Sequence, residues 1–182
     1  GEVTTLGSTT ATYNGAGNSD RTSLGNATFV NGVLGMTQRT TGGQTLRITR
    51  MPDGTPASLR GTSTHYYVHD HLGSVVGLFT QLGAGAGGYS YSPYGEARFT
   101  TSAAAVNTLN PLRYIGAYQD SASIYKLGAR YYDASLGRFT QMDPSEQEQY
   151  PNAYAGCNPI NNSDPTGTGA CTAAAGIAGV LH

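Results

Sequence analysis

The chain has 182 residues, of which 12% are charged, and its formal net charge is −1. So weak a charge argues against binding nucleic acid through a basic surface. No run of residues approaches the roughly 20 apolar residues of a membrane-spanning helix. Tyrosine outnumbers phenylalanine 13 to 4, and glycine occurs 26 times. Strands rich in Tyr and Thr between glycine turns predict an all-β chain of one domain or slightly more.

The first third of the chain is predicted to be a series of short strands. The candidates are Thr9–Tyr13, Ala27–Val30, Gly35–Thr40, Thr45–Arg50 and Ala57–Gly61. Pairs such as Asn31-Gly32 and Asp53-Gly54 separate neighbouring candidates, and such pairs are the strongest short signals for hairpins. No stretch of useful length has a helical period, so we expect strands and turns throughout.

From residue 64 onward an aromatic strand, a polar residue and a glycine turn recur as a degenerate repeat. The instances are His65–Gly73, Tyr89–Gly95 and Arg130–Gly137. This pattern predicts a repeat array in which each unit buries one face against its neighbours. We expect Gln81–Gly88, rich in Gly and Ala, to be a flexible hairpin tip, and Ser102–Leu109 to form one helical turn.

The composition changes after residue 144. Strand-breaking prolines and turn-forming asparagines predict an irregular segment over residues 144 to 168, with Tyr150 and Tyr154 as its packing anchors. The tail Thr168–His182 is small and apolar, too short to fold alone, and must pack inside something or begin a longer domain. Cys157 and Cys171 allow one disulfide or two free thiols, and their spacing fits no zinc motif.

The stretch Leu127–Pro144 is predicted to be a β-hairpin and is the most informative part of the chain. With Leu136 and Gly137 as a two-residue loop, Arg130 would lie opposite Asp143 on the neighbouring strand. Such a pair is either a structural salt bridge or the working part of a site.

Two further patterns allow a binding function. His65, His69 and His71 would share one face of a strand and could hold zinc or copper, although polar strand residues are the simpler interpretation. The many tyrosines could stack on a sugar, although they more often line a sheet.

An ordered set of motifs resembles the Rhs/YD-repeat family, at the repeat-associated core that closes the repeat region. The motifs are Tyr66–Val76, Tyr91–Gly95, Arg113–Gly116, Leu127–Asp133, Gly137–Phe139, Asp143-Pro144, Asn152–Pro159 and Asp164–Gly167. The resemblance divides the chain into upstream repeat strands (1–63), the core (64–168) and the start of a variable C-terminal region or a tail left after cleavage (169–182). It implies a fragment of a spiralling antiparallel sheet that ends in an irregular, inward-turning plug.

The resemblance also implies a function. Family members enclose a C-terminal toxin in a β-sheet shell, and many bacterial members cut their own chain just after the Asp-Pro-x-Gly motif. The residues that match those assigned to this self-cleavage are Arg130, Asp143 and Asp164, and the cut would fall at Thr168 or Gly169. The chain departs from the family pattern at Glu146, at Cys157 and at Thr168, where the family often has leucine.

We therefore expect a secreted or cell-surface bacterial protein used in competition, acting as a single-turnover aspartyl-type autoprotease. Asp143, ionised beside Arg130, would be the base, Asp164 the acid, and Arg130 could instead stabilise the oxyanion. No cofactor or metal is expected. The partners would be upstream shell strands or copies of the chain, together with a C-terminal effector, because a short sheet exposes open edges. The alternative is a non-catalytic structural or adhesive module that could bind glycans.

Overall fold

The computed structural model describes residues 4–15, 19–100, 109–144, 150–169 and 171–172. An 11-stranded antiparallel sheet is formed by strands that pair in sequence order. Its strands are β1 (Thr5–Leu6), β2 (Thr9–Tyr13), β3 (Arg21–Leu24), β4 (Ala27–Gly32), β5 (Gly35–Thr41), β6 (Gln44–Arg50), β7 (Pro56–Arg60), β8 (Thr64–His69), β9 (Val75–Thr80), β10 (Gly85–Tyr91) and β11 (Ala97–Thr100). The predicted all-β class is confirmed.

The long sheet follows from the alternation of apolar and polar residues. In β6, Leu46 and Ile48 are buried, while the residues between and beside them are more exposed. Such a strand covers a core with one face only. Thr49 of β6 lies opposite Ser58 of β7 on the other face, and their hydroxyls share a hydrogen bond of 2.7 Å. The sheet is therefore a meander of hairpins with one covered face.

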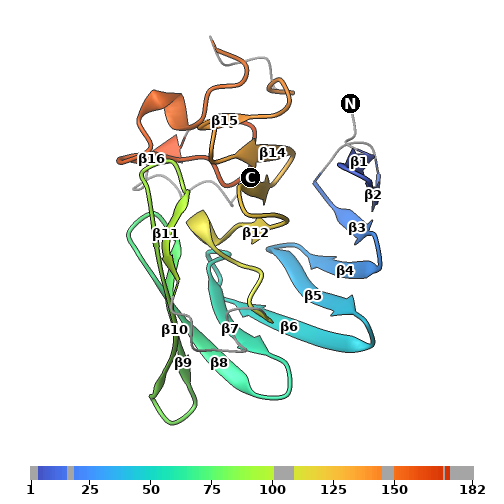
Figure 1. The fold of residues 1–182 in the computed structure, drawn as a ribbon, viewed down its shortest axis with the longest axis vertical. Coiled ribbons are helices and arrows are strands. Elements are labelled where there is room, and N and C mark those ends of the chain that lie inside the picture. The colour runs from blue at the N-terminus through green and yellow to red at the C-terminus, as the bar shows by residue number, and fades with distance from the viewer. Residues whose placement is uncertain (1–3, 16–18, 101–108, 145–149, 170, 173–182) are drawn as a thin grey trace.

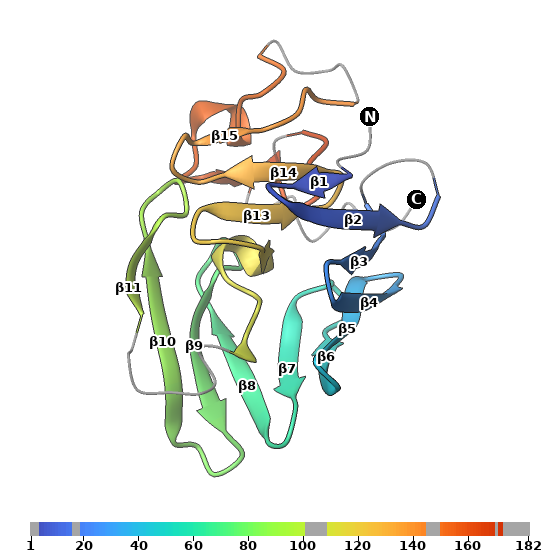
Figure 2. The same cartoon turned by 45° about the vertical axis from the view of Figure 1, so that its right-hand side comes forward.

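The long sheet curls around a second, four-stranded sheet (Figure 1). The strands of the second sheet are β12 (Tyr118–Gln119), β13 (Ile124–Leu127), β14 (Arg130–Asp133) and β15 (Arg138–Phe139). Figure 2 shows β1 and β2 beside β13 and β14 at one end of the curl, while β10 and β11 stand at the other. The second sheet is joined to both ends of the long sheet. At one end Arg21 of β3 forms an ion pair with Asp120, and at the other the Tyr132 hydroxyl donates a hydrogen bond to the Tyr94 carbonyl.

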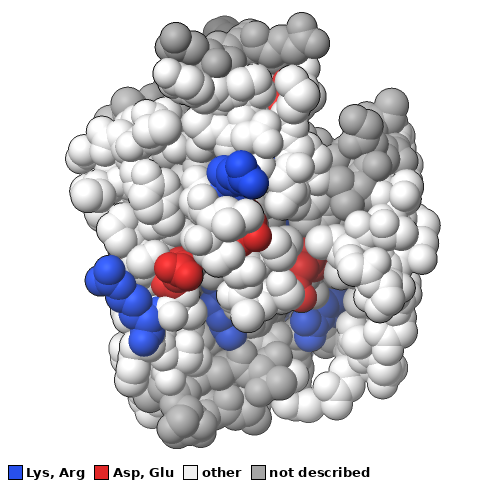
Figure 3. Space-filling model, turned by 45° about the horizontal axis from the view of Figure 1, so that its top comes forward, with Lys and Arg blue, Asp and Glu red and all other residues white. Residues whose placement is uncertain are grey.

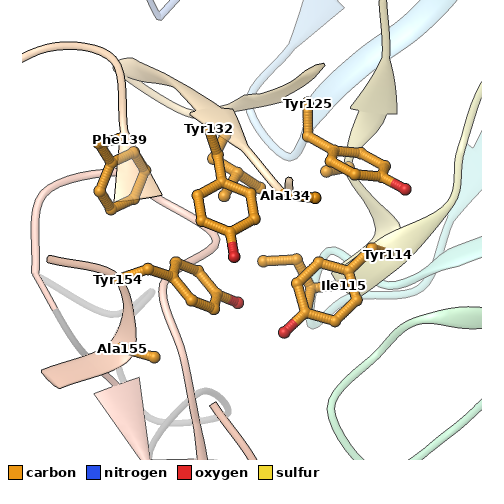
Figure 4. Packing of buried hydrophobic residues seen from close by; sticks show 10 residues of the cluster. Tyr114, Ile115, Tyr125, Tyr132, Ala134, Phe139, Tyr154 and Ala155 are labelled. Carbon is orange, nitrogen blue, oxygen red and sulfur yellow. The ribbon is translucent and has the colours of Figure 1, made fainter. Parts of the chain in front are cut away.

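Tyrosines fill the space between the two sheets. Around Tyr114 they form one core cluster with Tyr125, Tyr132, Phe139 and Tyr154 (Figure 4). Three of the hydroxyls reach backbone carbonyls of the β10–β11 connection: Tyr114 that of Pro93, Tyr132 that of Tyr94 and Tyr125 that of Gly95. Burial raises the pKa of Tyr114 to about 12, so this ring stays neutral and acts as a hydrogen-bond donor.

The irregular segment after residue 144 folds back against β15. Its elements are the 3₁₀ turn η2 (Ala155–Cys157) and the short strands β16 (Asn162–Ser163) and β17 (Cys171–Thr172), while a second 3₁₀ turn, η1 (Tyr114–Gly116), precedes β12. Asn152 bonds both backbone groups of Phe139, through its own carbonyl and its side-chain amide. Tyr154 is buried as predicted, whereas Tyr150 is 65% exposed and does not anchor the segment.

Several local predictions are corrected by the structure, and others concern residues that it does not describe. Strand β10 begins at Gly85, so the hairpin tip is shorter than the predicted Gln81–Gly88, because Gly85 and Gly87 pair with β9. The strands β1 and β3 were not predicted. A helical turn was expected over Ser102–Leu109, but residues 101–108 lie outside the described residues. Residues 173–182 of the predicted tail also lie outside them. Within the described ranges no helix is long and apolar enough to cross a membrane.

Candidate functional site

Arg130 lies at the centre of the candidate site. It is the first residue of β14, is 1% exposed, and its guanidinium carbon lies 3.5 Å from the centroid of the Phe139 ring. Its Nε donates to the Gly167 carbonyl at 2.6 Å, Nη1 to the Pro151 carbonyl at 3.0 Å and Nη2 to Asp164 Oδ2 at 3.0 Å. A planar guanidinium fork suits such a set of directed bonds. Arg130 therefore ties the irregular segment to β14.

Asp164 receives donors from its own turn as well as from Arg130. Its Oδ1 accepts from Thr166 Oγ1 at 3.1 Å and from the Thr168 amide at 3.3 Å, and Oδ2 accepts from the Gly169 amide at 3.1 Å. The side chain is 1% exposed. The carboxyl group thus contacts the nitrogens of two consecutive peptide bonds, Gly167–Thr168 and Thr168–Gly169.

Two glycines allow the Asp164–Gly167 turn to lie directly on the β13–β14 turn. Gly128 and Gly167 both have positive φ, of 43° and 65°, and a Cβ at either position would collide with backbone of the opposite turn. The Ala129 amide donates to the Thr166 carbonyl at 2.8 Å across this contact. Only glycine fits such a close approach of two backbones, and this approach brings Gly167 to the Arg130 guanidinium.

Asp143 is buried beside this site, but the hairpin register that was predicted for it is wrong. Strands β14 and β15 pair Tyr132 with Phe139 and Asp133 with Arg138, so four residues rather than two form the turn. Asp133 Oδ1 accepts from the Ser135 amide at 2.9 Å and from its hydroxyl at 2.6 Å. This Asx turn lies at the start of the four-residue turn and satisfies its first groups, and in the observed register Asp143 does not lie opposite Arg130.

Asp143 and Arg130 nevertheless share a partner. The Asp143 amide donates to the Pro151 carbonyl at 2.9 Å, and the same oxygen accepts from Arg130 Nη1. The Asp143 residue is 4% exposed. The structure therefore brings Arg130 and Asp164 into direct contact and places the Asp143 backbone one carbonyl away from them.

Three contributors to the site were not predicted: the Pro151 carbonyl, the Phe139 ring and Gly128. Phe139 and Gly128 stand within quoted motifs, Gly137–Phe139 and Leu127–Asp133. A glycine in the tight turn between two predicted strands, as Gly128 is, can signal close backbone approach. The Pro151 carbonyl is a backbone group and leaves no signal in a sequence.

The alternative sites have weaker support. His71 lies beyond the end of β8 and its ring nitrogen contacts the Ile160 carbonyl at 3.3 Å, so the three histidines do not share one strand face. Among the described residues no three His, Cys, Asp or Glu side chains gather closely enough to hold a metal ion.

Charges of both signs are interspersed on the face shown in Figure 3. Cys157 is a free, exposed cysteine.

A curled antiparallel meander with a second sheet and an irregular segment packed against it is the Rhs-like fold found in Tc toxin chains, to which the structure is similar. The chain superposes on a crystal structure of TcdB2-TccC3-TEV with a TM-score of 0.67 and 19% identity, over 87% of this chain and 9% of that one. It is also similar to a Photorhabdus luminescens Tc holotoxin pore with an aspartate-to-alanine substitution in TccC3, with a TM-score of 0.64 and 18% identity over 88% of this chain and 8% of that one. These likenesses show the fold.

Several curated proteins are similar in sequence, among them the following two. Salivary gland surface protein 1 of Aedes aegypti is 33% identical over 131 residues, which is 71% of this chain and 4% of that protein. The tRNA nuclease WapA of Bacillus subtilis is 31% identical over 110 residues, 57% of this chain and 5% of that protein. The chain thus spans a small part of the length of these relatives. No family model matches it.

Proposed function

We propose that this chain is the closing part of an Rhs-type shell, which encloses a C-terminal effector and releases it by one act of self-cleavage just after Asp164–Gly167. The effector, the upstream strands and a secreted or cell-surface location belong to this proposal. The observation that carries it is the buried contact of Arg130 with both Asp164 and the Gly167 carbonyl.

The geometry supports hydrolysis of a bond next to Thr168. At the Gly167–Thr168 bond, Arg130 Nε donates to the carbonyl oxygen and Asp164 contacts the nitrogen that would leave. At the Thr168–Gly169 bond, Asp164 contacts the leaving nitrogen. Donors aimed at the carbonyl oxygen stabilise the negative charge that develops as water attacks. The first bond has both groups in place, and the second has the amine contact.

The proposed reaction needs one water and two carboxyl groups. Water oxygen adds to the carbonyl carbon while Asp143 takes a water proton, and Arg130 stabilises the oxyanion. This proton then passes by way of Asp164 to the leaving nitrogen as the carbon–nitrogen bond breaks, so each carboxyl group ends the turnover in the form in which it began. The products are a free carboxylate and a free amine, and one turnover needs only proximity within the folded chain.

Intact mass spectrometry of the full chain tests this proposal. The wild type is expected to give a fragment that ends at Gly167 or Thr168, and Asp143→Asn, Asp164→Asn and Arg130→Met are expected to stay whole. Asp53→Asn is the matched control, because Asp53 also accepts a hydrogen bond from a backbone amide in a turn. The donor is the Thr55 amide at 2.9 Å, and the turn lies between β6 and β7, away from the candidate site. Acid breakage at Asp-Pro would instead end a fragment at Asp143 or Asp164. A wild type that remains whole after refolding would contradict the proposal.

A non-catalytic structural or adhesive module is the second candidate. The similarity to a protein whose name describes a surface protein favours it. This function predicts that the wild type and all three variants stay whole, with the Arg130–Asp164 pair acting only to hold the irregular segment on β14.

A further inference from the structure

A second buried ion pair lies on the opposite side of β14 from Arg130. Arg21 of β3 donates from Nη1 to Asp120 Oδ2 at 2.6 Å, and the two side chains are 4% and 3% exposed. The guanidinium carbon also lies 4.6 Å from the Phe29 ring centroid and 5.0 Å from that of Tyr118. The pair therefore joins the start of the long sheet to the second sheet.

Tyr131 connects this pair to β14. Its hydroxyl accepts from Arg21 Nη1 at 3.2 Å and shares a hydrogen bond of 2.6 Å with the Tyr13 hydroxyl of β2. The β13–β14 register pairs Tyr131 with Lys126 and Arg130 with Leu127. Neighbouring residues of a strand point to opposite faces of the sheet, so β14 carries Arg130 on one face and Tyr131 on the other.

The strand that presents Arg130 is thus held from behind by β2 and β3, although about 100 residues separate these strands in the sequence. The separations are 118 residues for Tyr13 and Tyr131 and 99 for Arg21 and Asp120. A small displacement of a positioned group slows a reaction strongly. Loosening β14 would move the Arg130 guanidinium away from the Gly167 carbonyl.

We propose that Arg21, Asp120 and Tyr131 form a latch, three positioning residues that make cleavage depend on closure of β2 and β3 onto the second sheet. This inference rests on the proposed function for its effect on cleavage. Its structural part, that the latch holds β14 in place, is independent of cleavage. In an uncurled chain the latch is open, and Arg130 is not yet in position.

The test compares refolded full-length variants. Arg21→Met with Asp120→Leu removes both charges, so neither remains buried alone, since a lone buried charge is strongly destabilising. Arg50→Met is the matched control, because Arg50 donates to the Met36 and Gly54 carbonyls within the long sheet and does not serve the second sheet in these bonds. Purified denatured chains are diluted into native buffer, and intact mass is followed over time beside hydrogen exchange of residues 130–133.

We expect the double variant to cleave at least tenfold more slowly than the wild type, with faster exchange over residues 130–133, and Tyr131→Phe to change both in the same direction by less. Arg50→Met should cleave within twofold of the wild-type rate at a comparable loss of thermal stability. A double variant that folds and cleaves at the wild-type rate would overturn the latch. If the wild type itself is not cut, the proposed function fails, and hydrogen exchange alone then tests the latch. Equal exchange rates over residues 130–133 in the double variant and in Arg50→Met would reject it.

Discussion

Lys126 gives a stability prediction that depends on the same buried layer as the latch. Its Nζ donates to the Gly128 carbonyl and lies 5.4 Å from the Tyr131 ring centroid. Burial, with a further contribution from the nearby Arg21 charge, lowers the pKa of Lys126 from 10.5 to about 7. The ammonium form is therefore less favourable in the folded chain than in the unfolded chain.

The sign of the pH dependence follows from proton binding. Between pH 7 and 10.5 the unfolded chain holds more protons at this lysine than the folded chain, so the free energy of unfolding rises with pH. With a folded pKa of about 7, the rise between pH 7 and pH 9 is about 2 kcal/mol. Below pH 7 the lysine is protonated in both states and its unfavourable contribution is constant.

The assay is denaturant unfolding of wild type and Lys126→Met at pH 7, 8 and 9. This window lies below the range in which unfolded tyrosines ionise and above the range of His69, whose pKa burial lowers. The difference between the two proteins removes the contribution of all other groups. Between pH 7 and pH 9 we expect the free energy of unfolding of the wild type to rise by about 2 kcal/mol relative to that of Lys126→Met. Parallel curves would refute the argument that folding lowers the pKa of Lys126.

Four further outcomes are expected. Gly128→Ala should destabilise the chain by at least about 1 kcal/mol, because alanine resists positive φ and its Cβ would meet the Thr166 backbone; thermal unfolding measures this, and an unchanged midpoint would contradict the close approach. Arg130→Met should cost about 3–5 kcal/mol in denaturant unfolding, since Asp164 is left buried without its cation, and Arg130→Met with Asp164→Leu should recover part of this loss. Tyr132→Phe should cost about 1 kcal/mol through the lost bond to the Tyr94 carbonyl, whereas a neutral effect would indicate that the hydroxyl is not needed there. Cys157 should react with a thiol reagent in the native chain within minutes; protection until unfolding would show that it is covered.

The strands of the long sheet could be predicted because their signals are local. Alternation and Asn-Gly or Asp-Gly turns placed Thr9–Tyr13 as observed and β4 to β7 within about two residues. Strand β3, by contrast, contains Arg21, whose burial depends on Asp120 99 residues away. A charged residue predicts exposure unless its partner is known, and a single sequence does not reveal that partner.

The residues selected for the candidate site lie close together, but they pair differently from the prediction. The motif likeness selected Arg130, Asp143 and Asp164, yet the hairpin geometry joined Arg130 to Asp143 instead of Asp164. The error has a local cause, since the turn that follows Asp133 has four residues rather than two. It also has a distant one, because the turn at Asp164 reaches β14 only where Gly128 and Gly167 let two backbones meet.

The two buried ion pairs, of Arg21 and of Arg130, are better understood together than separately. Arg130 and Tyr131 are neighbours on β14, and they bind opposite sides of the molecule, the first the irregular segment and the second the start of the long sheet. A two-residue step along a strand would place both side chains on one face, whereas a one-residue step separates them. The position of β2 and β3 is therefore transmitted to the Gly167 carbonyl through the backbone of one strand. No series of side-chain contacts is needed between Tyr131 and Arg130. This makes the coupling stiff, since β13 pairs with both residues and, on the other side of β14, the Tyr131 carbonyl accepts from the Thr140 amide at 2.9 Å.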